Sequence, residues 1–151
     1  ARTPGRSSVS TSTPHGETNL STLLAELAPQ LLPSLYVFCT LKGASYENIA
    51  HLKPLACITE PEGLTLVLMK TVANREKLPY QGTFRCIRLE VHSSLEAVGL
   101  TASVASELAT HNISANMIAG YYHDHVLVPA NLADLAMQRL ATLRAPSRSA
   151  S

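Results

Sequence analysis

The chain has 151 residues, of which 46% are hydrophobic, 15% charged and 5% aromatic, and its formal net charge is +1. A disordered protein is rich in charge and poor in apolar residues, so this composition excludes that class for the chain as a whole. Its 12 basic residues are balanced by 11 acidic ones, which argues against binding to nucleic acid by phosphate neutralisation. With no tryptophan and only 2 phenylalanines, stacking platforms for single-stranded bases are not expected.

The two ends of the chain differ in composition from the middle. Residues 1–16 are rich in Ser, Thr, Pro and Arg and contain no acidic residue. Such a segment cannot bury a core, so we expect residues 1–18 to form a disordered tail and residues 145–151 to form a second one. A remnant of a targeting peptide, which is typically rich in Arg and Ser, is the alternative for the first tail.

The cysteines and the apolar runs indicate a cytoplasmic protein. Cys39, Cys57 and Cys86 are an odd number of thiols, and each lies in an apolar, strand-like run. We interpret them as reduced, buried thiols. No apolar run approaches the roughly 20 residues that a membrane-spanning helix needs. Neither a membrane nor a nucleic acid is therefore expected as a partner.

The first part of the central region mixes a short helix with a strand. A helix is predicted over Leu20–Leu27, and Pro29 is expected to end it. Alternating apolar residues then predict a strand over Leu35–Leu41. The polar stretch Lys42–Lys53 is predicted as a loop, so the first crossover between strands has lost its regular helix.

A β-hairpin is predicted after this loop. Leu55–Glu60 and Leu64–Met69 are its strands, and the turn Glu60-Pro61-Glu62-Gly63 places Pro and Gly where a type I turn prefers them. A short helix over Thr71–Lys77 and a linker over Pro79–Gly82 complete the first half.

The second half begins with a predicted strand over Thr83–His92. Its apolar alternation changes phase between Cys86 and Ile87, which suggests a β-bulge or a late start of the strand. Arg85 and Arg88 are expected to lie on a solvated sheet edge, where charge discourages further strand pairing.

The remaining elements of the second half are more regular. Apolar residues at helical spacing predict helices over Leu100–Thr110 and Asn131–Leu143. Between them, Ile113–Tyr121 and His125–Pro129 are predicted to form a hairpin. The whole pattern indicates an α+β fold of two interlocked ferredoxin-like βαββαβ modules with antiparallel sheets. Residues 19–80 are the first module, with the degraded crossover, and residues 81–144 are the second.

Two phrases of the sequence resemble a known family. Glu62–Val67 reads EGLTLV, and Gly120–Pro129 reads GYYHDHVLVP. The segment before the second phrase places a Gly ahead of a helix of small and aliphatic residues. This pattern is similar to the tandem ACT-like family, which includes aspartate-kinase-type regulatory modules and the CASTOR arginine sensors. The resemblance covers Leu32–Leu143 and implies that both modules are ACT-like.

The resemblance implies a regulatory protein that senses a small amino acid or a related metabolite, without catalytic activity and without a cofactor. ACT modules typically bind an effector at an interface between two modules, near the loop before the first helix. The ligand is accordingly expected between the loop 93–101, the hairpin 116–124 and the strand 62–67 of the other module. The candidate ligand-binding residues are Ser93, Ser94, Glu96, Val98, Gly99, Leu100, Thr101, Asn116, Tyr122, Asp124, Gly63 and Leu64.

The loop before the second-half helix has two interpretations. Ser93 and Glu96 have the spacing of a capping box for an early helix start. Alternatively the helix begins after Gly99, leaving free N–H groups at Gly99, Leu100 and Thr101. Such N–H groups attract a carboxylate, which an amino acid supplies, through hydrogen bonding and the helix dipole. A simple turn with a cap is the structural alternative.

A ligand ammonium group needs an anionic partner. Asp124, at the tip of the predicted hairpin, and Glu96 are the two candidates. Ordinary turn chemistry is the alternative for Asp124, and a solvated or capping residue is the alternative for Glu96. Tyr121 and Tyr122 are expected to face opposite sides, one packing in the core and the other lining the ligand pocket. Asn116 is expected to bond backbone or simply to satisfy a strand edge.

Two histidines of the second hairpin offer a metal site as an alternative. His123 and His125 are two residues apart, so one side of a strand could present both to a metal, with His92, a cysteine or Asp124 as third ligand. Packing of these histidines at a module or subunit interface is the favoured interpretation. No nucleophile elbow, phosphate loop or zinc-protease helix is present in the sequence. The chain is predicted not to be an enzyme.

The alternative function is an ACT-like interaction or oligomerisation module whose ligand site is vestigial. In that case the partner is a second copy of the chain or a regulatory protein. In the favoured case the partner is a small amino acid or a related metabolite.

Overall fold

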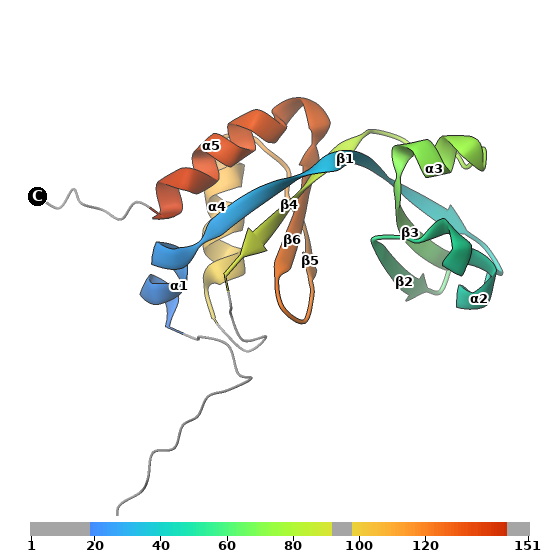
Figure 1. Ribbon diagram of the computed structural model, residues 1–151, viewed down its shortest axis with the longest axis horizontal. Helices are drawn as coiled ribbons and strands as arrows, with labels where there is room; N and C mark the ends of the chain where they lie inside the picture. Colours follow the sequence, from blue (N-terminus) through green and yellow to red (C-terminus); the bar gives the residue numbers. More distant parts are fainter. Residues whose placement is uncertain (1–18, 92–97, 145–151) are drawn as a thin grey trace, which may run out of the picture.

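The computed structural model describes residues 19–91 and 98–144, which form an α+β fold (Figure 1). Within these ranges, all the strands form one antiparallel sheet in the order β2-β3-β1-β4-β6-β5. The elements are α1 (Leu20–Glu26), β1 (Ala28–Leu41), α2 (Tyr46–Ile49), the 3-10 turn η1 (Ala50–Leu52), β2 (Ala56–Glu60), β3 (Gly63–Met69), α3 (Lys70–Arg75), β4 (Phe84–Glu90), α4 (Leu100–Thr110), β5 (Asn116–Ala119), β6 (Asp124–Pro129), the 3-10 turn η2 (Ala130–Leu132) and α5 (Ala133–Arg144). The predicted fold class is confirmed, with the two predicted sheets joined into one.

The long strand β1 joins the two halves of the molecule. Its residues 28–36 pair with β4, and its residues 36–41 pair with β3. Tyr36 lies at the junction, because it pairs with Phe84 on one side and with Met69 on the other. Figure 1 shows the helices in two groups, with α1, α4 and α5 around one end of β1 and α2 and α3 around the other.

The start of β1 corrects the predicted boundaries. The strand begins at Ala28 rather than Leu35 and contains both Pro29 and Pro33. Proline cannot donate a ladder hydrogen bond, so it is tolerated near the start of a strand or at a bulge. Pro29 is the second residue of β1, and Pro33 falls in the register shift between Leu31 and Leu35. Each proline therefore lies where the sheet needs no donor from it.

The predicted bulge lies on β1 rather than β4. Leu31 pairs with Ile87 and Leu35 pairs with Arg85, so β1 carries the extra residues opposite Cys86. The Arg85 side chain donates hydrogen bonds from Nη2 (2.8 Å) and Nε (3.2 Å) to the Leu32 carbonyl oxygen within this bulge. Cys86 and Ile87 are both buried because β4 is covered on both faces. The apolar alternation therefore changes phase between Cys86 and Ile87 because β4 is buried on both faces of the sheet.

The prediction that Arg85 and Arg88 lie on a sheet edge is wrong. β4 is a central strand, between β1 and β6, and the outer strands of the described sheet are β2 and β5. Arg88 is instead held by Glu90 on its own strand, with Nε at 2.6 Å and Nη2 at 2.5 Å from Oε2.

The predicted loop Lys42–Lys53 contains a shortened crossover. α2 has 4 residues and passes directly into the three-residue turn η1. The Ser45 N–H donates to Oδ1 of Asn48 at 3.0 Å, which fixes the start of α2. Ile49 and Leu52 are buried against the sheet. These two apolar residues hold a crossover that is otherwise polar in sequence.

Three clusters of buried residues hold the fold. The largest lies between the sheet and the helices α1, α4 and α5, and a second lies under α2 and α3. The third, around Tyr36, Val67, Cys86 and Leu127, lies on the concave face of the curled sheet. No helix within the described ranges is long and apolar enough to cross a membrane.

Candidate functional site

The structure describes only part of the ligand site predicted at the loop 93–101 of the second half. Ser93, Ser94 and Glu96 lie outside the described residues. Of the remaining residues, Val98 is 81% exposed, Leu100 is buried in the core, and Thr101 is exposed.

Gly99 is the residue immediately before α4, with a φ of 103°. This positive φ favours glycine, as the sequence predicts. The first hydrogen bond of the helix runs from the Ser103 N–H to the Gly99 carbonyl oxygen, at 2.9 Å. The backbone N–H groups of Leu100 and Thr101 come before the Ser103 N–H in the first turn of α4. They therefore have no acceptor within the helix.

The hairpin places the other predicted residues on two faces. Asp124 begins β6 in phase with Val126, which packs against the helices. Asn116 begins β5 in phase with Ile118, which packs on the concave face, and its Nδ2 donates to the Leu127 carbonyl oxygen at 3.3 Å. The structure therefore does not bring Asn116 and Asp124 to one side of the hairpin.

Asp124 has an environment unlike that of a solvated turn residue. Burial raises the pKa of its carboxyl above the usual value, and the neighbouring His125 and His123 rings oppose that rise. Its carboxylate is the only described acidic group at this end of the second half whose pKa is clearly shifted.

The two tyrosines of the hairpin do not behave as predicted. Tyr121 is 71% exposed and Tyr122 is 64% exposed, in the loop between β5 and β6 rather than on a strand. Their rings contact each other edge to face, with centroids 4.9 Å apart. Neither packs in the core, so the prediction of one buried ring is wrong, and the contact of Tyr122 with a ligand stays a prediction.

Gly63 and Leu64 lie at the far end of β1 from Gly99. Leu64 pairs with Leu41, the last residue of β1, whereas the first residue, Ala28, pairs with Glu90 just before the loop to α4. Thirteen steps of extended strand span roughly 40 Å. Within one chain, the predicted residues thus fall into two separate regions.

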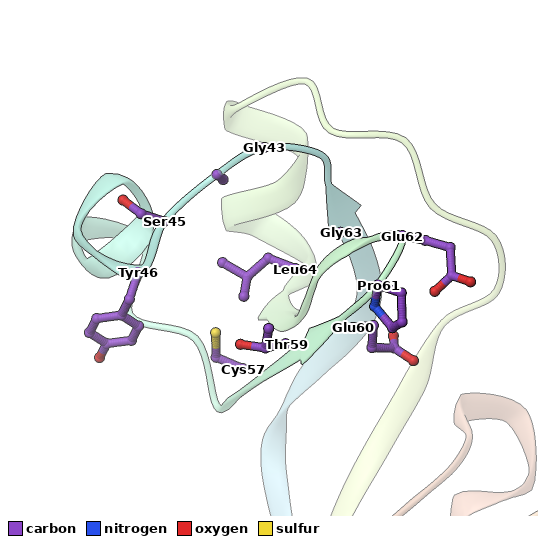
Figure 2. Close-up of a pocket in the computed structure, with 11 residues that line it drawn as sticks. Gly43, Ser45, Tyr46, Cys57, Thr59, Glu60, Pro61, Glu62, Gly63 and Leu64 are labelled. Carbon is purple, nitrogen blue, oxygen red and sulfur yellow. The ribbon is translucent and has the colours of Figure 1, made fainter.

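A pocket of about 480 Å³ surrounds Gly63 and Leu64 (Figure 2). It lies between the loop that leads into α2 and the hairpin β2–β3. These elements correspond to the loop before α4 and the hairpin β5–β6, where the second-half site is predicted. The lining residues are Gly43, Ala44, Ser45, Tyr46, Cys57, Thr59, Glu60, Pro61, Glu62, Gly63 and Leu64.

Figure 2 shows which of these side chains face the pocket. Leu64, Thr59 and Cys57 point into it, and the Tyr46 ring lies at its margin. The carboxylates of Glu60 and Glu62 point away from it. The side chains that face the interior are therefore neutral, with apolar surface from Leu64 and a hydroxyl from Thr59.

Glycine backbone shapes two sides of this pocket. Gly43 has a φ of 68°, and no atom lies within 4 Å of the position that a Cβ atom would take there, so the loop leaves open space. At Gly63 a Cβ atom would lie 3.0 Å from the Leu41 carbonyl oxygen, so the hairpin and β1 approach closely only because Gly63 has none. The sequence offered a usable signal, because Gly43 and Ser45 precede a helix start as Gly99 does.

The histidines do not form a metal centre with other described residues. No group of three or more His, Cys, Asp or Glu side chains within 19–91 and 98–144 is arranged to hold a metal ion. Burial lowers the pKa of His125, and the nearby Arg88 lowers it further. The Nδ1 atom of His123 is buried without a hydrogen-bond partner in the described chain.

Comparison with known proteins identifies the family. Residues 15–85 and residues 81–142 each match a model of the ACT domain. A protein of unknown function from Vibrio cholerae, described as a possible transport protein, is 48% identical, with 83% of this chain and 95% of that chain covered and a TM-score of 0.76. The chain therefore belongs to the ACT domain family and contains two such domains.

More distant structures share the fold. A protein from Agrobacterium tumefaciens is 17% identical over 78% of this chain and 89% of that chain, with a TM-score of 0.63. The regulatory subunit of aspartate kinase from Thermus thermophilus, in its ligand-free form, is 9% identical over 76% of this chain and 95% of that one, with a TM-score of 0.56. No curated protein matches the chain. The predicted resemblance is confirmed, and only regulatory domains are recognised in the sequence.

Proposed function

We propose that this protein is a regulatory protein that binds a small amino acid or a related metabolite and catalyses no reaction. The pocket of about 480 Å³ in the first ACT domain carries this proposal. Its volume lies within the range of roughly 300–1,000 Å³ that is typical of small-molecule sites. It lies between a strand-to-helix loop and a hairpin, which is where the ACT resemblance places an effector. The fold is shared with an aspartate kinase regulatory subunit, which supports a regulatory role.

The chemistry of the pocket favours a small neutral side chain on the ligand. Leu64 and Cys57 supply apolar contact, and the hydroxyl of Thr59 supplies both a donor and an acceptor. Because the Glu60 and Glu62 carboxylates point away, nothing inside the pocket selects a cationic side chain. We infer a small uncharged amino acid as the ligand class.

Isothermal titration calorimetry of the wild-type protein with each of the twenty amino acids tests the proposal. Thr59→Phe places a ring in the pocket on an exposed strand, where aromatic residues are tolerated, and is expected to weaken binding by about tenfold or more. Ile58→Phe is the matched control, because Ile58 is the preceding residue of β2 and points to the other face. Equal loss in both variants contradicts this location.

The second ACT domain offers the other proposed position. The terminal N–H groups of α4 beside Gly99 are suited to a carboxylate, and Asp124 lies on the helical side of its hairpin. Binding that survives Thr59→Phe but is lost in Asp124→Asn assigns the ligand to this position. Residues Ser93, Ser94 and Glu96 belong to the same proposal.

The alternative function is an interaction or oligomerisation module with a vestigial site. Absence of binding by every amino acid at millimolar concentration contradicts the sensor and favours that alternative. The free state of Cys39, Cys57 and Cys86 supports the proposal of a cytoplasmic protein, where thiols stay reduced.

A further inference from the structure

A second cleft, of about 650 Å³, lies on the opposite face of the first ACT domain from the proposed amino-acid pocket. Along β1, Val37, Cys39 and Leu41 pack toward α2 and α3, whereas Tyr36 and Phe38 pack on the concave side. Thr40 follows in phase with Phe38, so it belongs to the concave side as well. The residues that line the cleft are Phe38, Cys39, Thr40, Glu60, Thr65, Pro79, Tyr80 and Gln81, so Cys39 of the other face contributes to it as well.

The cleft lies at the open end of the curled sheet. The concave cluster fills the interior of the curl, and Phe38 belongs to the outer layer of that cluster. The Phe38 ring is fixed by edge-to-face contact with Phe84, with centroids 5.2 Å apart and planes at 84°. The linker that carries Tyr80 and Gln81 closes one side. Mouths of curled sheets and barrels are common positions for small-molecule sites.

Two hydroxyl groups around the cleft are arranged as hydrogen-bond acceptors. The Thr65 hydroxyl donates its proton to Oε1 of Glu60. The Tyr80 hydroxyl donates its proton to Oδ1 of Asn74, at 2.7 Å. Each hydroxyl has one proton, so both oxygens are left with lone pairs that accept from a ligand. Together with the Glu60 carboxylate, they form a set that a ligand with several donors satisfies.

The charge of the cleft points in the same direction. Glu60 is the one charged residue that lines it, and none of the ion pairs within the described chain involves Glu60. No Lys, Arg or His of the described residues lines the cleft, so a ligand carboxylate meets no cation there. A primary ammonium group supplies three donors and one positive charge, which matches both properties.

We propose that this cleft binds a primary organic ammonium ion with an apolar or aromatic body. The ammonium contacts the Glu60 carboxylate and the Thr65 oxygen, and the body lies against the Phe38 ring, Pro79 and the Tyr80 ring. Aromatic faces add attraction for a cation within reach. An amino acid fits less well, because its carboxylate faces Glu60 without a compensating cation. Glu60 lines both this cleft and the proposed amino-acid pocket, but its carboxylate points away from that pocket.

Benzylammonium chloride and n-butylammonium chloride are the probes, with benzyl alcohol as the neutral isostere and phenylalanine as the zwitterion. We expect both amines to bind in calorimetric titration of the wild-type protein, and the alcohol and phenylalanine to bind at least about fivefold more weakly, since one partly exposed charge pair is being removed or opposed. Glu60→Gln is expected to weaken amine binding by about fivefold. Glu62→Gln, two residues along the same turn, is the matched control and is expected to leave amine affinity unchanged.

Backbone amide NMR locates the probe. Benzylammonium is expected to shift the resonances of Thr40, Thr65 and Gln81 rather than those of Gly43 and Tyr46. Thr65→Val keeps the shape of the strand and removes one acceptor, so it should lower affinity without unfolding the sheet.

Three results overturn the proposal: no amine binding at millimolar concentration, equal binding of benzyl alcohol, or equal binding by Glu60→Gln and wild type. Its failure is distinguishable from failure of the proposed function. The amino-acid titration and the Thr59→Phe variant report on the other face of the hairpin, which the Glu60 carboxylate does not face.

Discussion

The two ACT domains share one order of elements but differ in how their helices cover the sheet. In the second domain the crossover is α4, an 11-residue helix that buries Leu100, Val104 and Leu108. In the first domain it is the 4-residue α2 followed by the three residues of η1, which bury Ile49 and Leu52. The cluster of buried residues under α4 and α5 is correspondingly larger than the cluster under α2 and α3.

The first domain stays folded although its helices cover less of its sheet. The first domain is joined to the second by one strand, because β1 pairs with both β3 and β4. Its sheet therefore continues a sheet that the second domain already stabilises. The short crossover leaves room beside the hairpin β2–β3, and the pocket of about 480 Å³ lies there. Loss of helix cover and gain of a pocket thus have one structural cause.

Truncating a buried leucine to alanine is expected to change stability most, and by different amounts in the two domains. Leu108→Ala removes a fully buried side chain between α4 and its neighbours, where the packing on all sides resists collapse. We expect it to lower the free energy of unfolding by about 3–4 kcal/mol. Leu52→Ala removes a side chain packed under a single turn, which can relax into the space left behind. We expect this variant to lower the free energy of unfolding by about 2 kcal/mol. Urea denaturation followed by circular dichroism measures both.

The shape of the transition tests the shared strand. If β1 makes the sheet one cooperative unit, both variants shift a single transition. Two separate transitions in Leu52→Ala, with the second unchanged from wild type, would show that the first domain unfolds alone. A larger loss in Leu52→Ala than in Leu108→Ala would reverse the comparison.

The next effect compares the glycines that precede the two crossovers. Gly99 has a φ of 103°, and a Cβ atom there would lie 2.9 Å from Cδ2 of Leu20. Gly43 has a φ of 68°, and a Cβ atom there meets nothing within 4 Å. We expect Gly99→Ala to lower the free energy of unfolding by about 2 kcal/mol through backbone strain and displacement of Leu20. Gly43→Ala should lower it by about 1 kcal/mol through strain alone.

Thermal unfolding at one pH measures the pair of glycine variants. Leu20→Ala combined with Gly99→Ala is the control for the contact, because it removes the atoms that the new methyl meets. If the double variant loses as much stability as the sum of the single variants, the Leu20 contact plays no part. Equal effects of Gly99→Ala and Gly43→Ala would remove this difference between the domains.

The sequence predicts local elements well where the pattern is strong. The bounds of α4 agree with Leu100–Thr110, because Gly99 marks its start and apolar residues recur at helical spacing. The hairpin β2–β3 and its Pro61-Glu62 turn are confirmed for the same kind of reason. The start of β1 is missed because Pro29 and Pro33 normally interrupt strands. Only the bulge opposite Cys86, a tertiary feature, makes room for Pro33.

The site is less accessible to sequence reasoning than the fold. Gly63 and Leu64 are part of the described pocket, but the prediction joined them to Gly99, which lies at the other end of β1. Local patterns do not reveal that the two groups of predicted residues lie at opposite ends of one strand of 14 residues. Tyr46 and Thr59 were missed because they lie in a polar crossover and on an edge strand, where neither periodicity nor charge marks them.

The cysteines of the two domains are expected to differ in how much they change the stability as the pH rises. Burial raises the pKa of Cys86 from its usual value of 9.0 to about 11, with Arg88 opposing the rise. A thiol with a raised pKa in the folded state contributes stability below its unfolded pKa, and this stability is lost as the pH rises toward the folded value. The loss attributable to Cys86 at pH 10 is about 1 kcal/mol relative to pH 8. Cys86→Ala should therefore lose less stability between pH 8 and pH 10 than wild type does, when both are followed by urea denaturation.

The control for this pH dependence is a cysteine of the first domain. Cys57→Ala is the matched variant on the partly exposed strand β2, and it controls for the loss of a thiol from the sheet as such. If Cys86→Ala and wild type lose equal stability over this range, the Cys86 thiol is not the group that titrates.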